Sequence, residues 1–223
     1  MRTIALFARW PEPGRVKTRL SPALPSGLAC QLQRAMLADS WAAAHAARAE
    51  RRVIYWAGAP AGAARAALPD ADAHHAAQGE GDLGARLDRA AAELSRDGAT
   101  RVVVIGSDAP ELTPACLDRA LDALAESDLV LSPAPDGGYS LVGWSRPPRG
   151  LFAGIPWSTP RVRDETEARA RSLGLATTIL EPVADVDTPA DLVALIGRLL
   201  ERPASAPATA GSLARLGFLP RPG

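Results

Sequence analysis

The sequence predicts a single α/β domain built on a mostly parallel, doubly wound sheet. Short apolar runs of strand length alternate along the chain with longer stretches of helical period. The clearest run, Val102–Ile105, consists of β-branched residues only, which is typical of a strand buried on both faces of a parallel sheet. The length of 223 residues suits one domain of ordinary size. In such sheets, ligands bind beyond the carboxyl ends of the strands.

The first half of the chain alternates strands and helices around one loop that cannot be helical. An apolar run opens the chain, and prolines and a glycine in the next segment rule out a helix there. An Ala-rich amphipathic stretch then predicts a long helix, and Asp82 is placed to cap a later one. The segment from the end of the helix predicted at 61–68 to Gln78 shows no hydrophobic periodicity. The predicted elements are a strand at 3–8, a loop at 9–22, a helix at 24–47, a strand at 53–56, a helix at 61–68 and a helix from Asp82 to about Ser95.

Thr-Pro pairs mark the helix starts of the second half, because Thr caps a helix and Pro fits its first turn. The pairs begin at Thr113, Thr159 and Thr188, and Asp191 completes a capping box with the last of them. Residues beyond Arg202 are rich in Pro, Ala and Gly, so we expect a domain at 1–200 and a mobile tail at 201–223. The other predicted elements are strands at 102–105, 129–131, 139–142 and 176–180, helices at 114–125, 160–173 and 189–200, and one short helical turn near 212–216.

Charge and composition exclude several classes of protein. Lys plus Arg and Asp plus Glu both number 25, and this balance argues against binding to nucleic acid or to an anionic membrane surface. No apolar run approaches the ~18 residues of a membrane span, and no signal peptide is expected before the first strand. Cys30 and Cys116 show no metal spacing and are expected in helices as small buried residues, which favours a cytoplasmic location. The histidines His45, His74 and His75 match no zinc or triad pattern and are expected on the surface of helices or loops.

The loop after the first strand gathers positive charge next to a glycine. Arg15, Lys17 and Arg19 fall within five residues, and Gly14 precedes them. Such a loop can cradle a phosphate, although a basic loop exposed to solvent would have the same composition. Lys17 is the only lysine in a chain whose other cationic residues are arginine, which favours a specific role as much as chance survival. The loop matches neither the Walker P-loop nor the dinucleotide fingerprint.

Carboxylates follow several predicted strands at the edge where these cations are expected. Asp108 ends the central strand after Ser107, Asp136 opens an Asp-Gly-Gly turn, and Asp185 and Asp187 precede the last long helix. Each is also explained by an ordinary role in a turn or cap. Together with the cations, these carboxylates match the needs of a nucleoside diphosphate bound with a divalent metal ion. The sequence contains no Ser/His/Asp or Cys/His set that would indicate a covalent hydrolase.

Six short motifs occur in one order over about residues 2–200. They are Pro11-Glu-Pro-Gly-Arg-Val-Lys-Thr-Arg-Leu20, Gly81-Asp-Leu-Gly84, Gly106-Ser-Asp-Ala-Pro110, Asp136-Gly-Gly-Tyr139, Trp157-Ser-Thr159 and Asp185-Val-Asp-Thr-Pro-Ala-Asp-Leu192. In this order they resemble the GT-A-type nucleotide-diphospho-sugar transferase superfamily. The resemblance is closest to its bacterial branch of selenodomain-associated or arsenosugar-biosynthesis-type glycosyltransferases. One departure is Ala109, where relatives often carry Cys.

The resemblance implies a metal-dependent transferase, with glycosyl transfer from a nucleotide sugar to a small acceptor as the expected reaction. The same superfamily contains guanylyltransferases and cytidylyltransferases, so nucleotidyl transfer from a nucleoside triphosphate, with release of pyrophosphate, is the alternative. A nucleotide-binding module without catalysis is a third reading. Mg²⁺ or Mn²⁺ is the implied cofactor; Asp187 is similar to a metal ligand of the cytidylyltransferases, and Asp185 is the other candidate at this position.

The candidate site residues fall into three groups. Asp108 and Asp187 are expected to hold the metal ion, and the expected catalytic residues are Lys17 and Asp136, the latter to orient a sugar or an acceptor hydroxyl. The backbone of residues 5–9 is expected to line the base. The residues expected to bind the nucleotide are Ala8, Arg9, Gly14, Arg15, Lys17, Arg19, Asp82 and Ser107.

Overall fold

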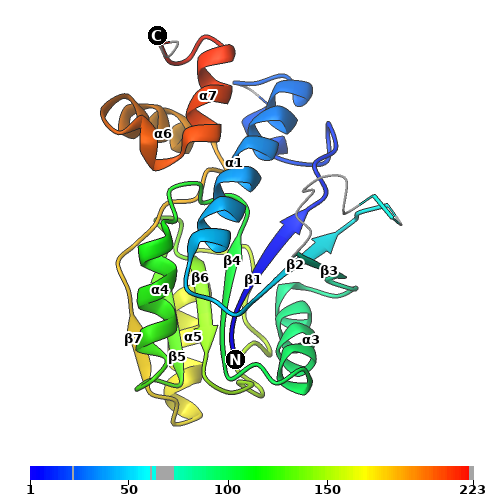
Figure 1. Cartoon of the computed structure of the whole chain (residues 1–223), viewed down its shortest axis with the longest axis vertical. Coiled ribbons are helices and arrows are strands. Elements are labelled where there is room, and N and C mark those ends of the chain that lie inside the picture. The colour runs from blue at the N-terminus through cyan, green and yellow to red at the C-terminus, as the bar shows by residue number, and fades with distance from the viewer. Residues whose placement is uncertain (22, 61, 64–72, 221–223) are drawn as a thin grey trace.

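A seven-stranded sheet crosses the described part of the chain, which is every residue except 22, 61, 64–72 and 221–223. In this computed structural model the strand order is β3-β2-β1-β4-β6-β5-β7, and only β6 runs antiparallel to its neighbours (Figure 1). The predicted mostly parallel α/β sheet is therefore confirmed. The strands are β1 (Arg2–Arg9), β2 (Arg51–Ala57), β3 (His74–Ala77), β4 (Arg101–Gly106), β5 (Leu129–Pro133), β6 (Tyr139–Trp144) and β7 (Thr177–Ile179).

Helices cover both faces of the sheet. Alternate residues of β1 and β4 point to opposite faces, so Ile4 and Val103 pack with α1 and α4, whereas Ala5 and Val104 pack with α3 and α5. Two apolar cores result, one on each side of the sheet, as expected for a doubly wound fold. The helices are α1 (Ser26–Ala46), α3 (Leu83–Arg96), α4 (Pro114–Ala123), α5 (Val162–Ser172), α6 (Pro189–Glu201) and α7 (Pro207–Arg215), with short 3₁₀ turns η1 (Thr18–Leu20) and η2 (Pro203–Ser205).

Most of the predicted helix starts are confirmed by their caps. Asp82 accepts a hydrogen bond from the backbone of α3, and Thr113 does the same for α4. Thr188 and Asp191 form a complete capping box at α6. The start predicted at Thr159 is wrong: α5 begins at Val162, and the Thr159 hydroxyl instead donates to the carbonyl of Pro156 at 2.7 Å, which closes the preceding turn.

The edge strand β3 was not predicted from the sequence. His74 and His75 lie in it rather than in a loop, and Val53 of β2 is the parallel partner of His74. The Trp56 indole donates to Nδ1 of His75 at 2.9 Å. A short strand of polar and small residues carries no alternation to recognise. The helix predicted at 61–68 lies outside the described residues, apart from 62 and 63.

The prediction of a mobile tail is wrong for residues 203–215, which form η2 and α7. Leu213 is fully buried in a third apolar cluster, which joins α7 to α1 and α6. The N-terminus of α7 is capped from another helix, because the Asp39 carboxylate of α1 accepts from the backbone of Ala208 at 2.9 Å and Thr209 at 2.8 Å. Burial raises the pKa of Asp39 above its ordinary value, although these hydrogen bonds oppose the shift.

The structure also bears on the expectations for the two cysteines and for membrane spans. Cys30 is buried in α1 and Cys116 half-buried in α4, and both are free thiols. Across the described residues, no helix is long and apolar enough to cross a membrane.

Candidate active site

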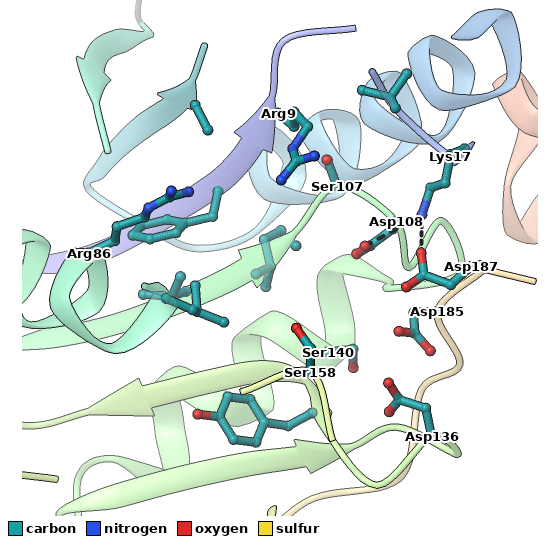
Figure 2. A pocket seen from close by; sticks show the side chains of 18 of the residues that line it. Arg9, Lys17, Arg86, Ser107, Asp108, Asp136, Ser140, Ser158, Asp185 and Asp187 are labelled. Carbon is teal, nitrogen blue, oxygen red and sulfur yellow. Dashed lines mark hydrogen bonds and ion pairs between the residues drawn. The ribbon is translucent and has the colours of Figure 1, made fainter. Parts of the chain in front are cut away.

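A cavity of about 730 Å³ opens at the edge where β1 and β4 end. Because β6 runs in the opposite direction, its beginning reaches the same edge. The cavity therefore collects side chains from segments far apart in the sequence (Figure 2). Its charged lining consists of Arg9, Arg15, Lys17, Arg19, Arg86, Asp108, Asp136, Asp185 and Asp187.

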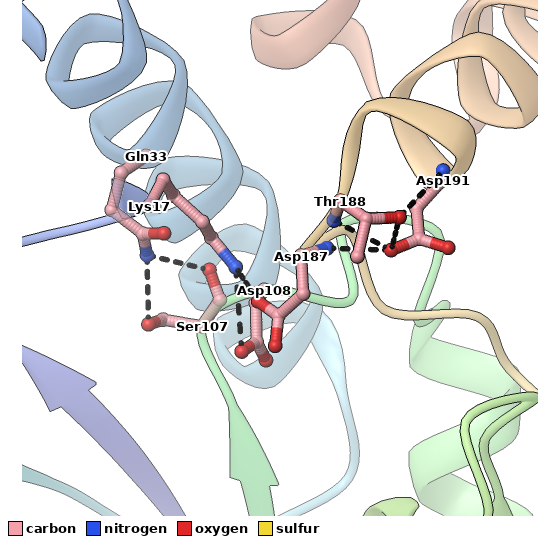
Figure 3. Close-up of polar contacts among 7 residues, drawn as sticks. All are labelled: Lys17, Gln33, Ser107, Asp108, Asp187, Thr188 and Asp191. Carbon is pink, nitrogen blue, oxygen red and sulfur yellow. Dashed lines mark hydrogen bonds and ion pairs between the residues drawn. The ribbon is translucent and has the colours of Figure 1, made fainter. Parts of the chain in front are cut away.

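Lys17 connects the loop after β1 to two of these carboxylates (Figure 3). Its side chain is 5% exposed, and its ammonium lies 2.7 Å from Asp187 Oδ1 and 3.5 Å from Asp108 Oδ2. Burial lowers the pKa of Lys17, but the charges of Asp108 and Asp187 outweigh it and leave the pKa above its ordinary value. A positive charge is thus held where the carboxylates converge.

The backbone of Lys17 is also unusual. It is left-handed, with a φ of 48°, in a region that residues other than glycine rarely occupy. Such conformations cost energy and occur often at functional sites. Here the left-handed residue directly precedes η1, whose Leu20 is fully buried in the third apolar cluster, so packing holds the Lys17 loop in place.

Asp108 is positioned by the turn that follows β4. The Gln33 amide, from α1, donates to both the carbonyl and the hydroxyl of Ser107 at 3.0 Å. The carbonyl of Asp108 accepts from the backbone of Val186 at 3.0 Å, which ties this turn to the segment before α6. At Gly106 a Cβ atom would stand 2.5 Å from Asp108 Oδ1, so a larger residue there would displace the Asp108 carboxylate from its observed position.

Asp187 is positioned by the capping box of α6 (Figure 3). The Asp191 carboxylate accepts from the backbone of Asp187 at 3.0 Å and of Thr188 at 2.7 Å. These bonds fix the backbone on which the Asp187 side chain turns toward Lys17. The negative charge on Asp191 at a helix N-terminus is itself favourable.

Four carboxyl groups, those of Asp108, Asp136, Asp185 and Asp187, gather at this end of the cavity (Figure 2). Burial, followed by the charges of Asp108, Asp136 and Asp187, raises the pKa of Asp185 to about 7. The charges of Asp108, Asp187 and Asp185 all act on the buried ammonium of Lys17. An additional cation would lower the electrostatic repulsion among these carboxylates.

The donor set fits a divalent cation shared with a substrate. Among the described residues, no group of three or more Asp, Glu, His or Cys is arranged to hold a metal ion. Mg²⁺, however, usually binds one or two carboxylates together with substrate phosphates, rather than a cage made of protein alone. Asp108 and Asp187 already converge on one cation, the ammonium of Lys17, and their oxygens are of the type that Mg²⁺ and Mn²⁺ prefer.

Most of the residues proposed from sequence line this cavity, and three do not. Ala8 is fully buried, and its carbonyl already accepts from Gln78. Gly14 supplies an exposed turn with a φ of 78°, and Asp82 is an exposed cap of α3. The residues that do line it are Arg9, Arg15, Lys17, Arg19, Ser107, Asp108, Asp136 and Asp187, together with Asp185.

Several cavity residues carried no signal in the sequence. Gln78 belongs to a stretch without hydrophobic periodicity, and Arg86 is one of several polar residues on a helix. Ser140 is 7% exposed, and its hydroxyl has no protein partner among the described residues. Ser158 has a left-handed backbone, with a φ of 62°, and its position next to a Thr-Pro pair gave no reason to expect that.

A family model and several solved structures relate the chain to known proteins. The family described as uncharacterized proteins conserved in bacteria (DUF2064) matches residues 37–159. Among solved structures, a candidate nucleotide-diphospho-sugar transferase from Desulfovibrio desulfuricans G20 is 30% identical over 96% of this chain and 95% of its own, with a TM-score of 0.88. No curated protein matches the chain.

Two more distant structures share the fold. Rv0371c from Mycobacterium tuberculosis H37Rv, in complex with manganese, is 22% identical over 91% of this chain and 100% of its own, with a TM-score of 0.52. A nucleotidyl transferase from Methanothermobacter is 15% identical over 90% and 98%, with a TM-score of 0.60. The resemblance to the selenodomain-associated or arsenosugar-biosynthesis branch stays a prediction. Because its family model covers more than half of the sequence, the chain belongs to this bacterial family, DUF2064.

Proposed function

We propose that the protein is a transferase that moves a sugar from a nucleotide sugar to a small acceptor with the help of a divalent cation. The observation that carries this proposal is the convergence of Lys17, Asp108 and Asp187 in a cavity at the carboxyl edge of the sheet. The description of the Desulfovibrio protein as a candidate nucleotide-diphospho-sugar transferase supports it. Mn²⁺ in the complex of Rv0371c supports a divalent cation.

In this proposal, different residues of the chain bind the phosphates, the cation and the acceptor. Lys17 and Arg19 neutralise the diphosphate, and Asp108 and Asp187 hold the cation. When bound, the cation would stabilise the charge that develops on the diphosphate as the sugar leaves. Asp136 is suited to accept the proton of the acceptor hydroxyl, because its turn lies at the same edge of the sheet.

Asp136 is held in place by close packing of its turn. Its carboxylate accepts from the backbone of Gly138 at 2.8 Å. Gly137 has a φ of 89°, and a Cβ atom there would stand 2.2 Å from the carbonyl of Pro160, so no larger residue fits. The fixed Asp136 carboxylate and the Ser140 hydroxyl, which has no partner in the described part of the chain, both line the cavity and could hold an acceptor.

Nucleotidyl transfer from a nucleoside triphosphate is the second candidate. Four cationic side chains, Arg9, Arg15, Lys17 and Arg19, line the cavity from β1 and the loop after it, which is enough charge to cover a triphosphate. The shared fold of the Methanothermobacter nucleotidyl transferase is compatible with this reaction. A module that binds nucleotides without catalysis would use the same cations and would have no need of the carboxylates.

Nucleotide and cation are expected to stabilise the protein together. At about 100 times its dissociation constant, a bound nucleoside diphosphate should add ~2.7 kcal/mol to the free energy of unfolding. The measurement is a thermal melt with each nucleoside diphosphate, in Mn²⁺ and in chelator, with the free nucleosides as controls. Equal melting temperatures with and without every nucleotide would exclude the proposal. A rise in melting temperature that is the same with and without Mn²⁺ would mean that nucleotide binding does not need the cation.

A further inference from the structure

The end of the cavity opposite Lys17 differs in character from the charged end. Figure 2 shows Arg86 and Lys17 on opposite sides of the cavity, with Arg9 between them. Around Arg86 the lining is largely apolar and includes Phe7, Leu83 and Leu87. An apolar wall with few polar groups is the usual environment of a flat, partly polar ligand group such as a nucleobase. With the phosphates at the cationic loop, this end is the one left for the base.

The backbone acceptors at this end are already in use. Gln78 is 6% exposed, and its amide donates to the carbonyl of Tyr55 at 2.9 Å and of Ala8 at 3.3 Å. Its backbone N–H donates to the carbonyl of Trp56 at 2.9 Å. Three carbonyls near the ends of β1 and β2, those of Ala8, Tyr55 and Trp56, therefore already accept from Gln78.

Arg86 uses only part of its guanidinium to hold this arrangement. Its Nε donates to the carbonyl of Gly81 at 2.9 Å, and its Nη1 donates to the side-chain oxygen of Gln78 at 3.2 Å. The Gln78 amide is thereby engaged on both its oxygen and its nitrogen. No described residue accepts from Nη2 of Arg86. This end of the cavity thus offers donors to a ligand, and its nearest acceptors are occupied.

We propose that this end selects the keto bases guanine and uracil over adenine and cytosine, with Arg86 as the residue that determines the specificity. The proposal rests on the nucleotide-binding function proposed above. Guanine presents O6 and N7 as neighbouring acceptors, and uracil presents O4. Adenine and cytosine present an amino group in the corresponding position, so a donor would face a donor and both would lose their partner. A preference of about tenfold or more follows from one such contact.

The experiment measures the affinities of four diphosphates, GDP, UDP, ADP and CDP, by calorimetry in Mn²⁺ on the full chain. For wild type we expect GDP and UDP to bind at least about tenfold more tightly than ADP and CDP. Arg86→Ala should weaken GDP and UDP to the level of the other two and leave ADP and CDP nearly unchanged. Arg86→Lys, which keeps the charge without the planar fork, should retain only part of the preference.

Arg19→Ala is the matched control, because it removes an arginine from the phosphate end and should weaken all four diphosphates by a similar factor. An equal loss for all four in Arg86→Ala would mean that Arg86 contacts a phosphate, and would overturn base selection. Equal wild-type affinities, or a preference for ADP or CDP, would overturn it without any variant. Both results leave nucleotide binding intact. If wild type binds none of the four, the proposed function fails and base selection fails with it.

Discussion

Replacing Lys17 with alanine is expected to weaken the binding of a nucleoside diphosphate by roughly ten- to more than a hundredfold. A charge-assisted contact to a phosphate oxygen contributes ~1.5–3 kcal/mol, which corresponds to this range of affinity. The side chain is 5% exposed and already held in the cavity, so little ordering is needed when the ligand binds. Calorimetry with the same diphosphate on wild type and variant gives the ratio, and circular dichroism reports whether the variant folds.

Two further variants sharpen the test of Lys17. Lys17→Arg keeps the charge but replaces a compact ammonium with a planar fork, in a space bounded by Asp108 and Asp187, so only part of the affinity should return. Arg15→Ala is the matched control from the same loop. Arg15 is 74% exposed and pairs with Glu12, so its loss should matter less. Wild-type affinity in Lys17→Ala would remove this residue from the site.

Replacing either Asp108 or Asp187 with asparagine is expected to lower cation-dependent turnover by about 10²–10⁴-fold. A bound divalent cation contributes several kcal/mol of charge stabilisation, and each ~1.4 kcal/mol corresponds to a factor of ten in rate. Asparagine preserves the shape of each side chain and removes one of the two negative charges that converge on Lys17. The measured quantity is the rate of diphosphate release from a nucleotide sugar across a range of Mn²⁺ concentrations.

The matched control for these carboxylates is Asp82→Asn. Asp82 caps α3 outside the cavity, and asparagine is an equally good cap, so turnover should stay at the wild-type level. If Asp108→Asn and Asp187→Asn keep the wild-type rate and the wild-type Mn²⁺ dependence, these two residues do not hold the cation. A rise in the Mn²⁺ concentration needed for half-maximal rate, with little change at saturation, would assign them to binding alone.

The charged half of the cavity could be predicted from sequence because each of its parts is a local pattern. A buried apolar strand that ends in a carboxylate predicts Asp108 at a ligand-binding edge, and a Thr-Pro capping box marks the segment of Asp187. The composition of the chain singled out Lys17. The sequence did not predict the direct contact of Lys17 with Asp187, because these residues are 170 positions apart.

The half of the cavity around Arg86 could not be predicted, because its residues become part of a site only through tertiary contacts. Arg86 is one of several arginines on helices, and only the position of α3 beside Gln78 makes it part of a binding site. Gln33 is a polar residue on a long helix and becomes a support of Ser107 only where α1 crosses the end of β4. No periodicity or spacing distinguishes such residues from a solvent-facing side chain.

The full C-terminal helix α7 could not be predicted from the sequence either, because its packing and its cap depend on residues far away in the chain. Its residues are small and lack a clear apolar period, and its cap comes from Asp39, 169 positions away from Ala208. Leu213 nevertheless lies in one buried cluster with Leu20 and Val186. Because Leu20 follows the Lys17 loop and Val186 lies between Asp185 and Asp187, α7 supports both sides of the charged site.

Identifying the product formed from a nucleotide sugar is the most direct test of the proposed reaction. The purified full chain is incubated with each nucleotide sugar and Mn²⁺, and separately with each nucleoside triphosphate, and released diphosphate and pyrophosphate are quantified. Sugar transfer predicts intact nucleoside diphosphate from at least one nucleotide sugar, through transfer or slow hydrolysis, and none when the cation is chelated. Pyrophosphate from a triphosphate, with no diphosphate from any nucleotide sugar, would contradict sugar transfer and assign the cavity to nucleotidyl transfer.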